Sequence, residues 1–308
     1  MRAALVGLGV QGGKRKKVAQ AHVVATVDPV NPSADFSKIS DLSDVNLDYA
    51  ILCIPDDEKI PVLNYFLDRG CDVLVEKPLM GHPSEIREIC QKFQSNNLIL
   101  YTAYNHRFEP HFIKIKEILG RNEIGKIYSL TMHYGNGTSR LVKDSSWRDS
   151  GLGIVSDIGS HLLDLLAFWF GEPFLETYLS KVELRAKAIE TKKYDNFTFI
   201  GESNEIRTIL SGSFLNWKNR FFLEIVGAAG IIEMSGLCKW GPSTLTVHRR
   251  VYPAGIPHTE SITLEKTDPT WDAEYKYFMQ LRAKRIIQPH STDLILNNFF
   301  QKLISEMN

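Results

Sequence analysis

Asp157 and His161 are the first pair of residues whose types and spacing could do chemistry. Apolar side chains recur at helical spacing through residues 151–171, which predicts an amphipathic helix that stops at Gly171. Residues four positions apart share a helix face, so this carboxylate and imidazole are expected to lie together. A carboxylate favours a charged histidine and can orient it for proton transfer. The alternative is an ordinary buried helix with a polar pair at its rim.

Lys77 is the next candidate, because it lies two residues after the end of a predicted buried strand over residues 72–75. An ammonium group there could hydrogen-bond to a reacting hydroxyl or carbonyl and stabilise an oxyanion. A lysine that merely pairs with Glu76 at the strand end is the alternative. Glu76 itself is expected to have a structural, hydrogen-bonding role.

A second polar group follows the predicted strand over residues 98–103. Tyr104, Asn105 and Arg107 stand where ligands of parallel sheets usually bind, at the carboxyl ends of strands. Arg107 is expected either to hold an anionic group of a substrate or to pair with Glu109. His106 is expected to be structural.

The glycines at positions 7, 9 and 12 form a G-x-G-x-x-G sequence directly after the predicted strand 3–6. Such glycines permit a tight turn and bring backbone N–H groups close to a pyrophosphate. Asp28 ends the next predicted strand, where a carboxylate that binds the ribose is expected. Since no arginine follows Asp28, the sequence favours NAD over NADP. The expected cofactor contacts are Gly7, Gly9, Val10, Gln11, Gly12, Asp28, Pro55, Glu76 and Lys77.

The elements that must position these residues alternate between strand and helix patterns through residues 1–103, which predicts a parallel sheet. The helix after the glycine loop is expected over 14–21, with Lys14–Lys17 as a solvated face. Short alternating stretches then predict a second sheet within residues 172–267. They are Tyr178–Ala186, Asn196–Ile200, Arg207–Phe214, Phe221–Val226, Ile231–Met234 and Leu245–Val251. Helices are predicted at Trp271–Lys284 and Thr292–Met307.

Composition bounds the class of protein. A chain of 308 residues suits two domains, and a formal net charge of zero argues against nucleic acid or an anionic membrane as the main partner. The four cysteines are scattered along the sequence, which is typical of free thiols in a reducing compartment. No apolar run is long enough to span a bilayer. We therefore expect a cytoplasmic protein. A cation site at Asp157, His161 and Asp164 is a weaker possibility, and no metal is expected.

Several motifs in order along the chain carry a family resemblance. They are the glycine loop, Glu76-Lys77-Pro78, Tyr104-Asn105-His106-Arg107-Phe108, Gly125-Lys126-Ile127, Trp147-Arg148 and Asp157-x-Gly159-x-His161-x-x-Asp164. The chain resembles the family of glucose–fructose oxidoreductase, inositol dehydrogenase and rhizopine-catabolism proteins over nearly its whole length. The resemblance implies an α/β fold: an N-terminal Rossmann domain, expected over 1–107, and a C-terminal α/β domain with a mostly antiparallel open sheet, expected over 108–308.

The resemblance also implies a function. Family members oxidise or reduce a sugar, polyol or nucleotide-sugar carbon with NAD(P), and Lys77, Asp157 and His161 match their catalytic residues. The expected substrate contacts are Lys77, Tyr104, Asn105, Arg107, Trp147, Arg148, Asp157 and His161. A homodimer or homotetramer through the C-terminal sheet is expected. The alternatives are an NAD-dependent glycoside hydrolase and a non-enzymatic, NAD-bound regulatory protein on the same fold.

Overall fold

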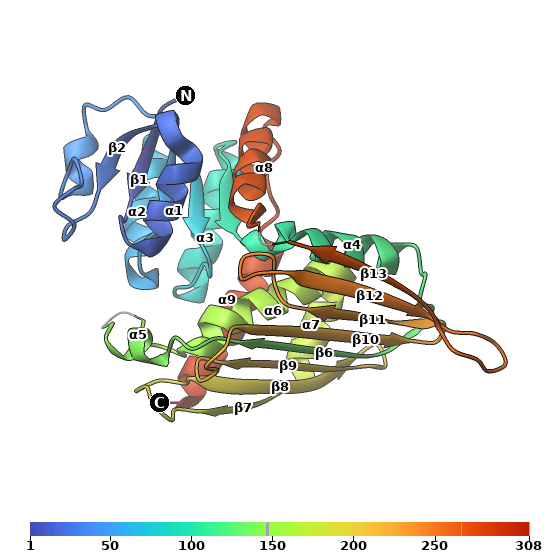
Figure 1. The fold of residues 1–308 in the computed structure, drawn as a ribbon. Helices are drawn as coiled ribbons and strands as arrows, with labels where there is room; N and C mark the ends of the chain where they lie inside the picture. The colour runs from blue at the N-terminus through green and yellow to red at the C-terminus, as the bar shows by residue number, and fades with distance from the viewer. Residues whose placement is uncertain (146–147, 266, 308) are drawn as a thin grey trace. The chain divides into compact units, whose positions relative to one another are not determined.

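The computed structural model describes residues 1–145, 148–265 and 267–307, which form two compact units (Figure 1). The first unit comprises Met1–Asn105 and Thr270–Lys302. The second comprises His106–Pro269 and the end of the chain from Leu303.

The first unit is built on a five-stranded parallel sheet with strand order β2-β1-β3-β4-β5. Its short apolar runs are buried on both faces, as is usual for parallel strands covered by helices. This confirms the predicted parallel sheet. The strands are β1 (Ala3–Val6), β2 (Val23–Val27), β3 (Tyr49–Leu52), β4 (Asp72–Glu76) and β5 (Leu100–Ala103).

Helices supply the apolar side chains for both faces of this sheet. On one face Phe278 and Leu281 pack with Leu5, Ile51 and Leu74. The other face is covered from two helices in the middle of the unit, through side chains such as Phe66 and Phe93. The helices are α1 (Val10–Ala19), α2 (Asp56–Asp68), α3 (Pro83–Ser95), α8 (Thr270–Lys284) and α9 (Ser291–Met307), with short 3-10 turns η1 (Gln20–His22), η2 (Ile39–Leu42) and η3 (Asn105–Phe108).

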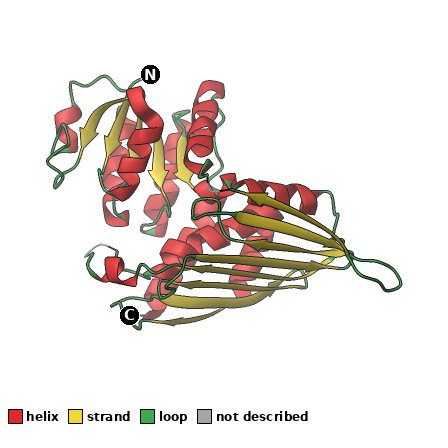
Figure 2. Cartoon of the chain, viewed as in Figure 1, coloured by secondary structure: helices red, strands yellow, loops and turns green. Residues whose placement is uncertain are grey.

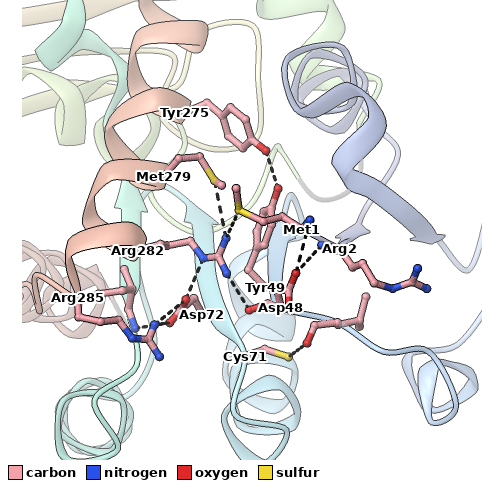
Figure 3. Close-up of polar contacts among 12 residues, drawn as sticks. Met1, Arg2, Asp48, Tyr49, Cys71, Asp72, Tyr275, Met279, Arg282 and Arg285 are labelled. Carbon is pink, nitrogen blue, oxygen red and sulfur yellow. Dashed lines mark hydrogen bonds and ion pairs between the residues drawn. The ribbon is translucent and has the colours of Figure 1, made fainter.

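Polar contacts tie α8 to the amino ends of the strands (Figure 3). Arg282 Nε donates to Asp72 Oδ2 at 2.9 Å, and Arg285 Nη1 donates to Asp72 Oδ1 at 2.8 Å. Tyr275 and Tyr49 share a hydrogen bond of 2.5 Å. A buried carboxylate such as Asp72 needs cationic partners, which are Arg282 on α8 and Arg285 directly after the helix. The chain therefore divides differently from the predicted domains 1–107 and 108–308, because residues 270–302 return to the first unit.

The second unit contains an eight-stranded sheet of order β13-β12-β11-β10-β6-β9-β8-β7 (Figure 2). All neighbours are antiparallel except β6 and β9, so the predicted mostly antiparallel sheet is confirmed. Ala228 and Ala229 connect β10 to β11 in an antiparallel hairpin. The strands are β6 (Ile127–Gly135), β7 (Glu183–Lys187), β8 (Asn196–Ser203), β9 (Ile206–Ser213), β10 (Arg220–Gly227), β11 (Gly230–Ser235), β12 (Ser243–Arg249) and β13 (His258–Leu264).

Helix α6 (Ile154–Phe170) is the helix predicted from residues 151–171. It begins after Gly153 and ends before Gly171, both in the left-handed region with φ of 57° and 86°. Position 153 requires glycine for a second reason, since a Cβ there would lie 2.3 Å from the carbonyl oxygen of Tyr194. The sequence motif thus fixes both ends of the helix.

The remaining helices of the second unit are α4 (Pro110–Gly120), α5 (Ser139–Lys143) and α7 (Glu172–Lys181). Helices α6 and α7 pack against β8 and β9. The prediction of an extended stretch over Tyr178–Ala186 is wrong at its start, because Phe174, Leu175 and Tyr178 are buried at helical spacing on α7. None of the helices within the described residues is long and apolar enough to cross a membrane.

Candidate functional site

The glycine loop leads directly into α1. Gly7 has φ of 89°, and a Cβ on Gly12 would lie 1.9 Å from the carbonyl oxygen of Gly7, so the turn tolerates no side chain at position 12. The helix begins at Val10, four residues earlier than predicted, and its first N–H groups therefore belong to the loop. Gly9, Val10 and Gln11 are exposed, and a Cβ on Gly9 would meet nothing within 4 Å. A phosphate can approach this backbone closely.

Asp28 closes the same loop from the end of β2. Its carboxylate accepts hydrogen bonds from the backbone N–H groups of Leu8 at 2.7 Å, Val30 at 2.9 Å and Asn31 at 2.8 Å. Burial alone would raise the pKa of Asp28, but these three donors outweigh it and hold the pKa below its usual value. A carboxylate offers about four acceptor positions, so a ribose hydroxyl can still donate to it. The loop and Asp28 together fit a dinucleotide such as NAD.

A buried ammonium group holds the backbone on both sides of Lys77. Lys59, on α2, is 1% exposed, and its Nζ donates to the carbonyl oxygens of Glu76 at 2.7 Å and Pro78 at 2.5 Å. The same ammonium group pairs with Asp56 at 2.6 Å. Lys77 is partly buried between the two clamped carbonyls and precedes a cis peptide bond to Pro78. The conformation at Lys77 is therefore set by Lys59, which the sequence did not single out.

Arg15 gives Glu76 its hydrogen-bonding role. Arg15 Nε lies 2.7 Å from Glu76 Oε1, and Arg15 Nη2 lies 2.7 Å from Glu274 Oε2. The guanidinium group also stacks over Trp271 at 4.4 Å and is 1% exposed. The prediction that Lys14–Lys17 is a solvated face is thus wrong at Arg15, because two acidic side chains distant in sequence neutralise it.

Burial has opposite consequences for the two main partners in this cluster. For Arg15, burial lowers the pKa, but Glu76 and Glu274 outweigh it and raise the pKa above its ordinary value. For Glu274, burial is the largest cause and raises the pKa to about 7, against the attraction of Arg15. The unit that carries the glycine loop thus contains a carboxyl group, that of Glu274, whose pKa lies near neutral pH.

The second unit brings His161 onto the ring of His106. Their centroids lie 3.9 Å apart with an angle of 21° between the planes, and the residues are 7% and 3% exposed. His106 also faces the ring of Tyr134 at 5.9 Å and the ammonium group of Lys239, whose Nζ lies 3.3 Å from His106 Nε2. Neither His106 nor Lys239 was predicted as a functional residue. No local pattern marks them, because they come from η3 and from the turn between β11 and β12.

Asp157 lies one turn before His161 on α6, as predicted, and is partly exposed. It forms an ion pair with Arg148, Nη2 to Oδ2, at 3.8 Å. Trp147, predicted beside Arg148 as a substrate contact, lies outside the described residues. The roles of Asp157, Arg148 and His161 in binding or catalysis stay predictions.

Arg107 pairs with Asp164 and not with Glu109, the structural partner that was predicted for it. Its Nε and Nη2 donate to the two oxygens of Asp164 at 2.9 and 2.5 Å, and Glu109 instead accepts a hydrogen bond from the Cys238 thiol at 2.8 Å. Asp164 is buried, so this bidentate pair supplies the cation that its carboxylate requires.

Among the described residues no group of three or more His, Cys, Asp or Glu side chains is arranged to hold a metal ion.

The other predicted contacts lie at strand ends of the first unit. Tyr104 is buried directly after β5. Asn105 Nδ2 donates to Thr270 Oγ1 at 2.9 Å, which ties β5 to the start of α8. Pro55 caps the N-terminus of α2 after β3. Together with Lys77 after β4, these residues occupy the carboxyl edge of the sheet, where the glycine loop also lies.

Known proteins resemble this chain in sequence and in fold. Residues 1–104 match the oxidoreductase family with an NAD-binding Rossmann fold, and residues 112–233 match the GFO/IDH/MocA C-terminal domain. An uncharacterized oxidoreductase of Schizosaccharomyces pombe is 30% identical over 45% of this chain and 38% of its own length. Inositol 2-dehydrogenase of Rhizobium meliloti is 24% identical over 58% of this chain and 50% of its own length.

The fold is shared with solved structures. Levoglucosan dehydrogenase in complex with NADH superposes with a TM-score of 0.82 at 16% identity, over 99% of this chain and 97% of that one. The chain spans about half the length of the curated relatives it matches. Because family matches cover both units, with an NAD-binding Rossmann fold in the first and the family's C-terminal domain in the second, the chain belongs to the GFO/IDH/MocA family of oxidoreductases.

Proposed function

We propose that this protein transfers a hydride between NAD and a hydroxyl-bearing carbon of a sugar or polyol. The observation that carries the proposal is the placement of an imidazole at His161, one turn after the carboxylate of Asp157, on a buried helix whose ends are fixed by glycines. Lys77 supports it from the first unit, where a buried clamp sets the backbone at the end of β4. The relatives named for inositol and levoglucosan support a polyhydroxylated substrate.

Bound NAD⁺ would supply the hydride acceptor through its nicotinamide ring. Gly7, Gly9 and Gly12 would hold its pyrophosphate, and Asp28 its ribose. His161 would take the proton of the substrate hydroxyl as general base, and Asp157 would favour the resulting imidazolium. Lys77 would donate a hydrogen bond to a reacting hydroxyl or carbonyl oxygen and stabilise its negative charge. The substrate contacts that we propose are Lys77, Tyr104, Asn105, Arg107, Trp147, Arg148, Asp157 and His161.

The test replaces the two proposed proton-handling groups. His161→Asn and Lys77→Ala should each lower turnover at least about a hundredfold, the lower range for general acid–base catalysis, while NADH still binds. Inositols, anhydrosugars and free sugars would be screened by NADH formation. Wild-type turnover in both variants would refute these roles. Glycoside cleavage without net NADH would favour a hydrolase, and NADH binding without any turnover would favour a regulatory protein.

We also propose that NAD is preferred to NADP because of Asp28. A 2′-phosphate would meet this carboxylate, whose pKa is held low, and would be repelled. Fluorescence titrations should show tight NADH binding and weak NADPH binding, and Asp28→Ala should reduce the difference between the two affinities. Equal affinities in the wild-type protein would contradict this preference.

A second copy of the chain is the partner we propose for the open face of the large sheet. Residues that alternate with the buried ones on β8, β9, β10 and β11 include the half-buried Ile200, Ile209, Phe222 and Ile231. Such an apolar patch is typical of an interface. Light scattering should give a dimer or tetramer that Ile209→Glu dissociates, and a wild-type monomer would refute the proposal.

We propose a reducing compartment, such as the cytoplasm, as the place where the protein acts. All four cysteines are free thiols, and Cys71, Cys90 and Cys238 are buried in their units. Imaging of a fluorescent fusion would test this, and a signal confined to an oxidising compartment would contradict it.

A further inference from the structure

Lys239 lies against the histidine stack of the second unit, and the proposed function does not use it. Its Nζ lies 3.0 Å from Tyr134 Oη and 3.3 Å from His106 Nε2. The same ammonium group stands 5.1 Å from the ring centroid of Trp240. These partners come from β6, η3 and the turn after β11, so the fold assembles the contact from distant segments.

The ammonium group of Lys239 keeps its charge at neutral pH. Burial acts to lower its pKa, but Tyr134, Asp268 and Glu109 outweigh burial and raise the pKa above its usual value. Glu109 itself is buried, which raises its pKa, and it accepts a hydrogen bond from Cys238. Lys239 is thus a fixed cation beside the stack.

An ammonium group has three donors and no acceptor. The contact between Lys239 Nζ and His106 Nε2 is a hydrogen bond only if Nε2 carries no proton and accepts it. His106 is then a neutral imidazole with its proton on Nδ1, because the imidazolium and the other neutral tautomer would each place an N–H on Nε2 against the N–H donors of the ammonium group. Lys239 therefore selects both the charge and the tautomer of His106.

The charge of His106 matters to His161 because the two rings are stacked 3.9 Å apart and buried. Two imidazolium rings at this distance would repel each other strongly, so the stack takes up at most one proton beyond those of the two neutral rings. Asp157 and Asp164 on α6 are charged groups of the same unit, and each has its own arginine, Arg148 and Arg107. Glu109 and Asp268 act on Lys239 and raise its pKa. Lys239 itself is a cation in direct contact with the stack.

We propose that Lys239 is a positioning residue that keeps His106 neutral and thereby reserves the proton of the stack for His161. This inference rests on the proposed role of His161 as general base. During alcohol oxidation the substrate O–H bond breaks, its proton goes to His161, and the carbinol hydride goes to NAD⁺. Without Lys239, His106 competes for that proton, and a protonated His106 weakens His161 as a base.

The direct test observes the rings and needs no substrate. Titration of isotope-labelled histidines by NMR should show His106 with an unprotonated Nε2 and no charge change between about pH 5 and pH 8 in the wild-type protein. In Lys239→Met, His106 should titrate within that window, and in Lys239→Arg it should not. His106→Phe assigns the resonance among the nine histidines. A proton on His106 Nε2 in the wild-type protein would overturn the proposal, even if Lys239→Met did not fold.

The kinetic test follows the acid limb of the pH profile of kcat/KM for alcohol oxidation. Loss of the cation and gain of a second proton acceptor both favour the protonated stack, so Lys239→Met should move this limb to higher pH by about one unit. Lys239→Arg should leave it in place. When His106→Phe is already present, Lys239→Met should shift the acid limb by less than about half of the shift seen with His106 in place, since Lys239 acts through His106.

These outcomes separate the two proposals. An equal shift with and without His106 would overturn the inference while leaving the general base intact. If no sugar or polyol were oxidised, the proposed function would fail, and the NMR titration would still decide whether Lys239 controls the stack.

Discussion

Glu274→Gln should remove a pH dependence of stability that the buried cluster around Arg15 creates. The carboxyl group of Glu274 is fully buried, and its pKa rises from an ordinary 4.5 to about 7 in the folded protein. Between these values the native state holds a proton that the unfolded state has released. Stability is therefore lost as the pH rises through this window.

The size of the effect follows from the same two values. Linkage gives a loss of about 2 kcal/mol in the free energy of unfolding between about pH 5.5 and about pH 7.5 from this one group. Glutamine has nearly the same shape and stays neutral, so the variant should lack that loss. At the lower pH the wild-type side chain is mostly protonated, and the two proteins should be similarly stable.

The assay is urea unfolding of both proteins at several pH values, followed by tryptophan fluorescence. The wild-type protein should lose about 2 kcal/mol relative to Glu274→Gln across that range. Glu85→Gln, an exposed substitution on α3, is the matched control and should parallel the wild-type protein. Parallel curves for wild type and Glu274→Gln would show that Glu274 is ionised throughout, and the reasoning about its burial would be wrong.

Three other substitutions test the remaining contacts. Gly12→Ala should weaken NADH binding at least about tenfold, because its Cβ would lie 1.9 Å from a backbone carbonyl oxygen. The control is Gly13→Ala, whose Cβ would meet nothing within 4 Å and which should bind NADH normally. Equal NADH affinities of the two variants in a fluorescence titration would contradict this. Lys59→Met should lower kcat about tenfold in steady-state assays, since the carbonyl groups of Glu76 and Pro78 each lose a hydrogen-bond donor at a cost of about 1–3 kcal/mol. An unchanged kcat would refute the idea that Lys59 positions Lys77. Arg107→Lys should cost about 1.5–3 kcal/mol in urea unfolding by breaking the bidentate pair with Asp164, and an unchanged midpoint would refute that value.

Periodicity explains which elements could be predicted from the sequence. Helix α6 has apolar residues at regular spacing between two glycines, and the prediction agrees closely with Ile154–Phe170. Strand β13 could not be found in this way, because nearly all of its residues are exposed and no apolar alternation marks it. The last residues of α7, Tyr178–Lys181, were assigned to a strand, since so short a stretch does not distinguish the helical period from the strand period.

The polar side chains show a different limit. The glycine loop, Asp28 and Lys77 could be recognised because local spacing and neighbouring strands mark them. The burial of Arg15 could not, since it depends on Glu76 and on Glu274, which reach it only in the folded unit. The stacking of His106 on His161 likewise joins two segments that no short motif relates.

The return of α8 to the first unit has a consequence for the order in which the protein can be completed. Synthesis delivers β1 to β5 first, but Arg15 receives Glu274, and Asp72 receives Arg282, only after the whole large sheet has been made. Until then the nascent sheet exposes the apolar face that Phe278 and Leu281 later cover. The nucleotide-binding unit is therefore begun before the large sheet and completed only after it, and a fragment ending at Asn105 would lack the helix that closes its core.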